Sequence, residues 1–308
     1  MKQPITATAP GKVILLGEHA VVYGHPALAG ALAGGVTVEA APGDGWLRVP
    51  EWSASVRADR SSASSLGRAF AAILERLAVA PGWRMPAVDL TARFGLPTGA
   101  GLGSSAALSV AMVRVLADCA GIAASSELVL DAAMAAETIF HGRASGIDHA
   151  VSAHGGFGLF SRRDGLCPLA AARPVPLVVG HTGRARDTEG RVARVAELTS
   201  ERPDETRERF AAIAALVARA ASAIGEARFC DLGAAMNDNQ RHLAALEVSC
   251  PEIESMCAIA RDAGAVGAKL TGGGGGGCVI ALAPGREEAV RSAWSAAGHA
   301  SFVTEVGQ

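Results

Sequence analysis

One carboxylate of this chain stands where a hydrophobic residue is expected. Glu137 continues a stripe with the spacing of one helix face, whose other members are the apolar residues Leu130, Ala133 and Met134. An isolated buried charge is too costly, so Glu137 must pair with a cation or be protonated. Bound Mg²⁺ is a natural partner, because this hard ion takes one or two protein oxygens together with phosphate oxygens. A salt bridge with an arginine elsewhere in the chain is the alternative.

A second candidate for chemistry is a glycine-rich segment in front of an expected helix. Residues 97–111 read Pro-Thr-Gly-Ala-Gly-Leu-Gly-Ser-Ser-Ala-Ala-Leu-Ser-Val-Ala. Gly99, Gly101 and Gly103 allow a tight turn whose N–H groups point the same way, and the helix adds its own free N–H groups and dipole. The segment therefore predicts a phosphate-binding loop, with an ordinary glycine turn into a helix as the alternative. Its spacing matches neither a Walker loop nor a dinucleotide-binding fingerprint.

Lysine is scarce in this chain. Of 28 basic residues, only Lys2, Lys12 and Lys269 are lysines, and the others are arginines. Lys12 and Lys269 both stand in glycine-containing segments. Lysine offers a compact ammonium where arginine offers a planar fork. This bias favours a chemical requirement for lysine at position 12.

Composition limits the classes of partner. The chain has 308 residues, a formal net charge of −2 and no basic run, so nucleic acid and anionic membranes are not expected as partners. No stretch of about 18 apolar residues is present, and no apolar segment follows a basic start. The six cysteines show no C-x-x-C spacing and are interpreted as reduced residues. We therefore expect a cytoplasmic enzyme.

The hydrophobic pattern predicts a mixed chain of two domains. Strands are expected around residues 6–40, 88–94, 177–180, 266–270 and 278–282, and helices at 64–77, 104–120, 126–141, 187–198, 204–224, 231–246 and 251–264. Strands and helices do not alternate regularly, which favours an α+β fold over a doubly wound sheet. A segment rich in proline, small and charged residues near 162–176 indicates the junction, so the predicted domains are 1–165 and 166–308.

Three segments resemble the GHMP kinases. Residues 97–106 match the phosphate loop of that family, Pro-x-x-x-Gly-Leu-Gly-Ser-Ser-Ala, at every specified position. Residues 9–24, Ala-Pro-Gly-Lys-Val-Ile-Leu-Leu-Gly-Glu-His-Ala-Val-Val-Tyr-Gly, look like its N-terminal signature in the form that its mevalonate-phosphorylating members carry. Residues 268–278, Ala-Lys-Leu-Thr followed by six glycines and a cysteine, look like its C-terminal glycine motif.

The resemblance implies a fold and a reaction. The expected fold has an N-terminal α+β domain with the phosphate loop and a ferredoxin-like C-terminal α/β sandwich. The implied reaction is ATP-dependent phosphorylation of a primary alcohol, the 5-hydroxyl of mevalonate, which gives 5-phosphomevalonate for isoprenoid biosynthesis. ATP is the co-substrate and Mg²⁺ the cofactor. If the protein forms an oligomer, we expect a homodimer.

The resemblance also assigns roles to individual residues. Asp148 accepts or orients the proton of the attacking hydroxyl, with Lys12 beside it, and Ser105 and Glu137 hold the metal. Glu18, His19 and Thr188 are assigned to the substrate pocket. The ATP-binding residues are Pro97, Gly99, Ala100, Gly101, Leu102, Gly103, Ser104 and Ser105. The glycine motif is represented by Gly272, Gly273, Gly274 and Gly275. On spacing alone, Ser145-Gly-Ile-Asp148 also fits a capping box.

Some positions depart from the family pattern. Arg143-Ala144 stands where asparagine or threonine and then proline are usual, and His149 replaces a small polar residue, which puts the substrate fit in question. Phe94 lies where a polar residue near the nucleotide is expected. The alternatives are therefore a related kinase for phosphomevalonate or homoserine, and a ligand sensor that uses the kinase fold without catalysis.

Overall fold

The computed structural model describes residues 4–142 and 145–307 and packs them into two compact units. The first, here called the loop unit, contains the chain up to Lys12 and then Gly34–Gly155. The second, the glycine-motif unit, contains Val13–Ala33 and the chain from Gly156 onward. The predicted boundary between 165 and 166 differs from this division. Residues 13–33 belong to the second unit because Ala27 to Gly30 pair with Phe160 to Phe157.

The described residues of the loop unit combine β-strands with the α-helices α1 to α4. Its strands and helices are the first part of β1 (Ile5–Leu16), the second part of β2 (Ala27–Pro42), β3 (Trp46–Val49), β4 (Ala54–Arg57), α1 (Ser65–Leu77), β5 (Val88–Phe94), α2 (Ser104–Ala120), α3 (Ser126–His141) and α4 (Ile147–His154). A short 3-10 helix, η2 (Pro50–Trp52), joins β3 to β4. The strand order is β4-β3-β5-β2, with β1 also paired to β2.

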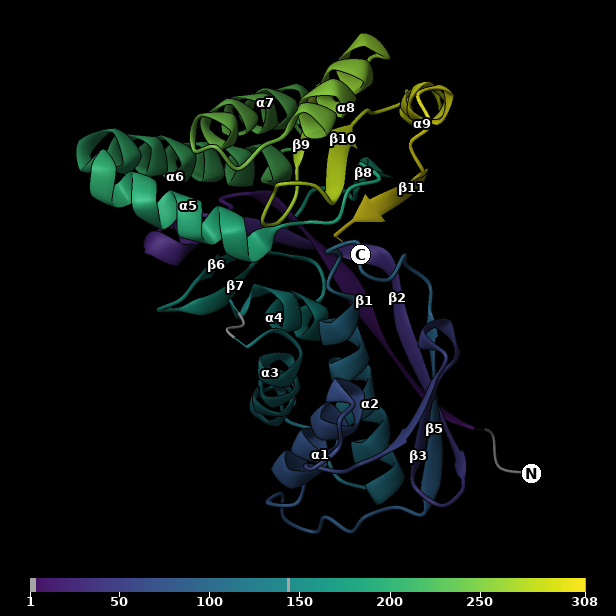
Figure 1. Cartoon of the computed structure of the whole chain (residues 1–308). Helices are drawn as coiled ribbons and strands as arrows, with labels where there is room; N and C mark the ends of the chain where they lie inside the picture. The colour runs from purple at the N-terminus through teal and green to yellow at the C-terminus, as the bar shows by residue number, and fades with distance from the viewer. Residues whose placement is uncertain (1–3, 143–144, 308) are drawn as a thin grey trace. The chain divides into compact units, whose positions relative to one another are not determined.

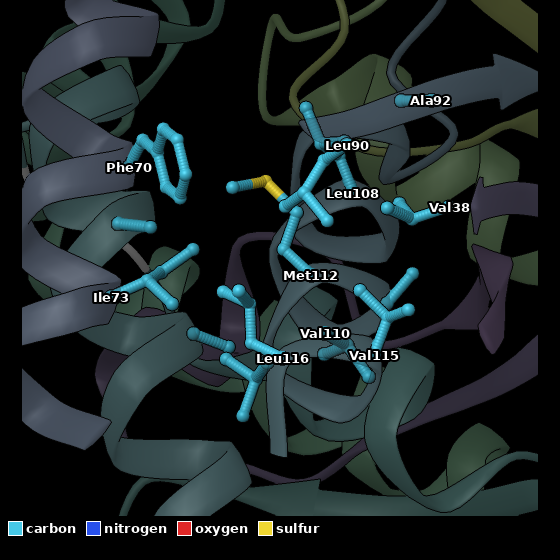
Figure 2. Close-up of a cluster of buried hydrophobic side chains, with 14 of the residues drawn as sticks. Val38, Phe70, Ile73, Leu90, Ala92, Leu108, Val110, Met112, Val115 and Leu116 are labelled. Carbon is cyan, nitrogen blue, oxygen red and sulfur yellow. The ribbon is translucent and has the colours of Figure 1, made fainter. Parts of the chain in front are cut away.

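The helices of the loop unit pack against one another, and α1 and α2 also contact its strands. Helix α3 contacts α1, α2 and α4, and α2 also contacts β5; in Figure 1, α2 lies between α3 and strand β5. Figure 2 shows the core that forms between them, where Phe70 and Ile73 of α1 face Met112 and Leu116 of α2. All four side chains are at most 2% exposed. This apolar contact fixes the direction of α2, and therefore the direction in which its N-terminus points.

The glycine-motif unit is built on a second set of antiparallel strands. It contains the end of β1, η1 (Ala20–Tyr23) and the first part of β2, followed by β6 (Phe157–Ser161), β7 (Gly165–Leu169), β8 (Val175–His181), α5 (Thr188–Glu201), α6 (Pro203–Gly225), α7 (Phe229–Ala245), α8 (Pro251–Asp262), β9 (Gly267–Leu270), β10 (Cys278–Leu282), α9 (Glu287–Ala296) and β11 (Ser301–Val306). The order β11-β8-β10-β9 is antiparallel throughout.

Helices α7, α8 and α9 cover the sheet of the glycine-motif unit. Helices α7 and α8 contact β9, and α9 contacts β8 and β11. Trp294 of α9 is fully buried, and its indole N–H donates a hydrogen bond to the carbonyl oxygen of Met256 in α8 at 2.9 Å. The largest side chain of this core therefore has a partner for its one polar group. The glycine run forms the connection between the paired strands β9 and β10.

The observed architecture is the predicted α+β class. Helices α2 and α3 begin and end at the predicted residues, and β5 spans the predicted range. Helices α4 and α9 and strand β11 were not among the predicted elements. Within the described ranges 4–142 and 145–307, no helix is long and apolar enough to cross a bilayer.

Candidate active site

The predicted phosphate loop leads directly into α2. Gly99, Gly101 and Gly103 have φ values of +75°, +81° and +73°, in the left-handed region that favours glycine. Gly103 is the N-cap residue of α2. The backbone N–H of Lys12 donates to the carbonyl oxygen of Leu102 at 2.8 Å, which ties the loop to strand β1. The first N–H groups of a helix have no hydrogen-bond acceptor within the helix. The N-terminus of α2 can therefore donate hydrogen bonds to an anion such as phosphate.

The side chain of Lys12 runs against Gly103. A Cβ atom at Gly103 would lie 2.8 Å from Cγ of Lys12, closer than real contacts of this kind. Lys12 is only 3% exposed, and its Nζ lies 3.1 Å from Oδ1 of Asp148. The two predicted catalytic residues are therefore a direct ion pair, positioned by β1 and by the first turn of α4.

The surroundings of Asp148 are not those of a capping box. The N-cap residue of α4 is Gly146, and the Ser145 hydroxyl accepts from the N–H of Ile147 at 3.4 Å, not from that of Asp148. The Asp148 carboxylate is engaged by Lys12, while its side chain keeps 28% of its surface exposed. A carboxylate held on one side and open on another is suited to accept a proton from a hydroxyl group.

Ser105 and Glu137 approach one common point. The hydroxyl of Ser105 lies 3.0 Å from Nε2 of His141, and Oε2 of Glu137 lies 3.8 Å from the same nitrogen. Glu137 is 2% exposed, as its place on the apolar stripe predicted. A hydroxyl and a carboxylate gathered at one point are hard oxygen donors of the kind that Mg²⁺ prefers, so these residues fit the ion. The sequence indicated only a structural role for His141, although its spacing four residues after Glu137 places both on one helix face.

In the glycine-motif unit, Glu18 is part of a buried ion pair. Its carboxylate accepts a hydrogen bond from the ammonium of Lys269 and another from Nδ2 of Asn239 at 3.2 Å. The side chains of Lys269 and Glu18 are 0% and 1% exposed. Burial lowers the pKa of the Lys269 ammonium, and the charge of Glu18 opposes that shift. Lys269 was singled out in the sequence only by the scarcity of lysine, and its partner lies 251 positions away.

The neighbouring His19 has an unusual backbone conformation. Its φ and ψ are 61° and −49°, and the N–H of Ala20 donates to the carbonyl oxygen of Glu18 at 2.7 Å. These features define a classic γ-turn, which is rare and strained. Nε2 of His19 lies 2.9 Å from the carbonyl oxygen of Gly273 and must donate to it, because a carbonyl only accepts. Burial lowers the pKa of His19 below its ordinary value, and that hydrogen bond opposes the shift. At neutral pH the lowered pKa favours the neutral ring, in which Nδ1 is the hydrogen-bond acceptor.

Thr188 and the glycine motif meet in the same unit. Thr188 is the first residue of α5, whose N-cap Asp187 accepts from the N–H of Gly190 at 3.0 Å. A Cβ atom at Gly273 would lie 2.6 Å from Oγ1 of Thr188, so Gly273 allows this close approach. The next two glycines pack on Val248. A Cβ at Gly274 would lie 2.1 Å from the Val248 carbonyl oxygen, and the N–H of Gly275 donates to that oxygen at 2.9 Å.

The predicted site residues thus form two groups. The loop unit holds Lys12, Ser105, Glu137, Asp148 and the phosphate loop, and the glycine-motif unit holds Glu18, His19, Thr188 and the glycine motif. Of the positions that depart from the family pattern, Arg143 and Ala144 lie outside the described residues. His149 is buried on α4, and burial lowers its pKa. The ring of Phe94 packs on Trp52 with ring centres 5.1 Å apart, which explains its apolar character.

Known families match both units. The model of the GHMP kinases N terminal domain matches residues 64–156, and that of the GHMP kinases C terminal matches residues 204–300. A mevalonate kinase of Pyrococcus horikoshii is 35% identical over 333 aligned positions, which cover 100% of this chain and 97% of that protein. This chain belongs to the GHMP kinases. As a GHMP kinase, it is an ATP-dependent small-molecule kinase.

Solved structures of GHMP kinases share the fold. The structure of L. major mevalonate kinase in complex with R-mevalonate has a TM-score of 0.86 and 27% identity, and the match covers 100% of this chain and 99% of that one. Lactococcus lactis galactokinase complexed with galactose has a TM-score of 0.77 at 19% identity, covering 100% and 94%, and shows the fold alone. The predicted α+β GHMP kinase fold is therefore confirmed.

Proposed function

We propose that this GHMP kinase transfers the γ-phosphoryl group of ATP to the 5-hydroxyl of mevalonate and so supplies 5-phosphomevalonate to isoprenoid biosynthesis. The observation that carries the catalytic part is the Lys12–Asp148 ion pair, 3.1 Å long, in the same unit as the phosphate loop. The choice of mevalonate as the alcohol is supported by the 35% sequence identity with a mevalonate kinase, in an alignment that covers 97% of that protein.

The reaction is an in-line displacement at phosphorus. The oxygen of the substrate hydroxyl forms a bond to the γ-phosphorus, and the bond from that phosphorus to the bridging oxygen of ADP breaks. The proton of the hydroxyl passes to the free carboxylate oxygen of Asp148, whose other oxygen is held by Lys12. The Lys12 ammonium stabilises negative charge on the attacking oxygen and on the transferred group.

The residues of the loop unit also hold the nucleotide in this proposal. The N–H groups of the loop from Pro97 to Ser105 bind the phosphates. Ser105 and Glu137 would hold Mg²⁺, which neutralises charge on the phosphate oxygens when it is bound. Nε2 of His141 lies 3.0 Å from the Ser105 hydroxyl, next to the residues that would hold the ion.

The glycine-motif unit supplies the substrate contacts in this proposal. His19 presents Nδ1 as a hydrogen-bond acceptor for a substrate hydroxyl, since Nε2 is committed to Gly273. Thr188 offers a hydroxyl at the first turn of α5. The carboxylate of Glu18 is occupied by Lys269 and Asn239, so its part is to support the neighbouring histidine. A cytoplasmic location is proposed with this function, because the six cysteines are all free thiols and ATP is the co-substrate.

A comparison of alcohols tests the proposal. The purified protein is given ATP, Mg²⁺ and, separately, mevalonate, phosphomevalonate, homoserine or galactose, and ADP release is followed. We expect mevalonate to have the highest kcat/KM by at least about tenfold, a difference of about 1.4 kcal/mol in transition-state binding. A higher kcat/KM for phosphomevalonate or homoserine would reassign the substrate within the family. Turnover of none of the four alcohols would favour the non-catalytic sensor.

A further inference from the structure

The turn at His19 is held in place by several independent contacts. A classic γ-turn at a non-glycine residue is strained and persists only where its surroundings impose it. On one side, the imidazole of His19 is hydrogen-bonded to the Gly273 carbonyl oxygen. On the other, the side chain of Glu18, whose carbonyl oxygen closes the turn, is fixed by Lys269 and Asn239.

Among the residues that hold this turn, Lys269 is the one whose charge is most deeply buried. Its side chain is 0% exposed, and its ammonium donates to the Glu18 carboxylate and to the carbonyl oxygen of Leu270. Taking an ammonium out of water is expensive. In a chain that otherwise uses arginine almost throughout, a lysine retained at such a position indicates a need for a compact cation.

We propose that Lys269 is a positioning residue for the substrate pocket, which acts by holding Glu18 and thereby the strained turn that aims His19. The inference rests on the proposed substrate contact of His19. Lys269 itself is not proposed to touch substrate or nucleotide. Because the phosphate loop, Lys12 and Asp148 belong to the other unit, loss of Lys269 should weaken binding of the alcohol and leave ATP binding and the transfer step largely intact.

A purely structural role makes a different prediction. If the pair served only to neutralise buried charge, replacing both members with neutral residues would restore stability and substrate binding together. Replacement of a buried ion pair by neutral groups is often tolerated, whereas removal of one partner leaves an uncompensated charge. If the pair positions the turn, the neutral double variant should regain stability but not substrate affinity.

The test compares Lys269→Met, Lys269→Arg and the double variant Glu18→Gln/Lys269→Met with the wild type. Melting temperature, KM for mevalonate, KM for ATP and kcat are measured for each. The single Met variant should melt lowest. The double variant should recover most of the melting temperature but keep a KM for mevalonate at least about tenfold above that of the wild type, with KM for ATP within about twofold. Lys269→Arg keeps the charge without the shape, so it should also raise KM for mevalonate.

A cavity variant elsewhere in the same unit is the matched control. Val290 of α9 is fully buried, so Val290→Ala lowers stability without touching the turn at His19, and KM for mevalonate should stay at the wild-type value. Recovery of both melting temperature and KM in the double variant would overturn the proposal, as would a raised KM in Val290→Ala. A wild-type protein that does not phosphorylate mevalonate contradicts the proposed function instead, so the two failures are distinct.

Discussion

The ammonium nitrogen of Lys12 lies 3.1 Å from Oδ1 of Asp148, and solvent reaches the two side chains very unequally. The Lys12 side chain is 4% exposed and that of Asp148 is 28% exposed. The cation is therefore fixed by its surroundings, while the carboxylate keeps an open side. This difference in exposure fits the two proposed roles, in which Lys12 orients the Asp148 carboxylate and stabilises negative charge, and Asp148 accepts the proton of the reacting hydroxyl.

Replacement of Lys12 should separate catalysis from folding. Lys12→Met keeps the length of the side chain and removes its charge, and Asp148 can then be hydrated because it is partly exposed. We expect kcat to fall by about 10² to 10³, the usual effect of removing one preorganised electrostatic contact. The melting temperature should change by only a few degrees. A kcat within threefold of the wild type would exclude Lys12 from the transfer step.

The metal assignment predicts a changed Mg²⁺ dependence in two variants. Ser105→Ala removes a hydroxyl oxygen donor, and Glu137→Gln replaces a charged carboxylate with a neutral amide that binds Mg²⁺ more weakly. Each should raise the Mg²⁺ concentration needed for half-maximal rate by about tenfold or more. Calorimetric titration of ATP into each variant at several Mg²⁺ concentrations provides a readout independent of turnover.

Thr138→Ala is the control for this prediction. Thr138 follows Glu137 on α3, and its hydroxyl donates to the carbonyl oxygen of Met134 within the helix. It should keep the wild-type Mg²⁺ dependence. An unchanged Mg²⁺ dependence in both Ser105→Ala and Glu137→Gln would show that these two residues are not Mg²⁺ ligands.

Two glycines at the ends of α2 give a matched pair of substitutions. Gly103 and Gly121 have similar positive φ values of +73° and +69°, so alanine at either should cost about 1 to 2 kcal/mol of unfolding free energy. Only the Cβ at position 103 meets Lys12, and a Cβ at position 121 has open space around it. We therefore expect Gly103→Ala to lower kcat and Gly121→Ala to leave it unchanged. Equal kcat values in the two variants would contradict the packing of Lys12 on the loop.

The lowered pKa of His19 should contribute to a loss of stability of the folded protein at acidic pH. Burial lowers its pKa in the folded protein below the ordinary value of 6.5. Below about pH 6.5 the unfolded chain binds a proton at this residue that the folded protein does not, so stability falls as the pH decreases through this window. His19→Gln removes this contribution, and its melting temperature should drop less between pH 7.5 and pH 5.5 than that of the wild type. An equal or larger drop would mean that His19 is charged in the folded protein.

The sequence predicted best the elements with strong local signals. Helix α2 begins at the predicted Ser104 because a left-handed glycine precedes a long apolar stripe, and α3 begins after Ser125, whose hydroxyl caps the N–H of Leu128. Helix α4 was missed because it is only eight residues long and lacks a side-chain cap. Its start at Gly146 nevertheless places Asp148 in the first turn, beside Lys12.

The contacts that organise the site could not be predicted from spacing. Glu18 and Lys269 are 251 positions apart, and no local pattern indicates that their charges meet. The γ-turn at His19 also has no signature in residue types, because a histidine rarely adopts that conformation. The family motifs located the residues, and only the fold explained why Glu18 is buried and how His19 is held.

Identification of the product formed from mevalonate tests the proposed phosphoryl transfer directly. Wild-type protein, ATP, Mg²⁺ and mevalonate are incubated, and the product is followed by phosphorus nuclear magnetic resonance and mass spectrometry, with Asp148→Asn in parallel. We predict one phosphate monoester at the 5-oxygen, formed about 10² to 10⁴ times more slowly by Asp148→Asn, which should bind ATP as the wild type does. Absence of this product with the wild type would exclude mevalonate as the substrate, and its formation at the wild-type rate by Asp148→Asn would exclude Asp148 as the proton acceptor.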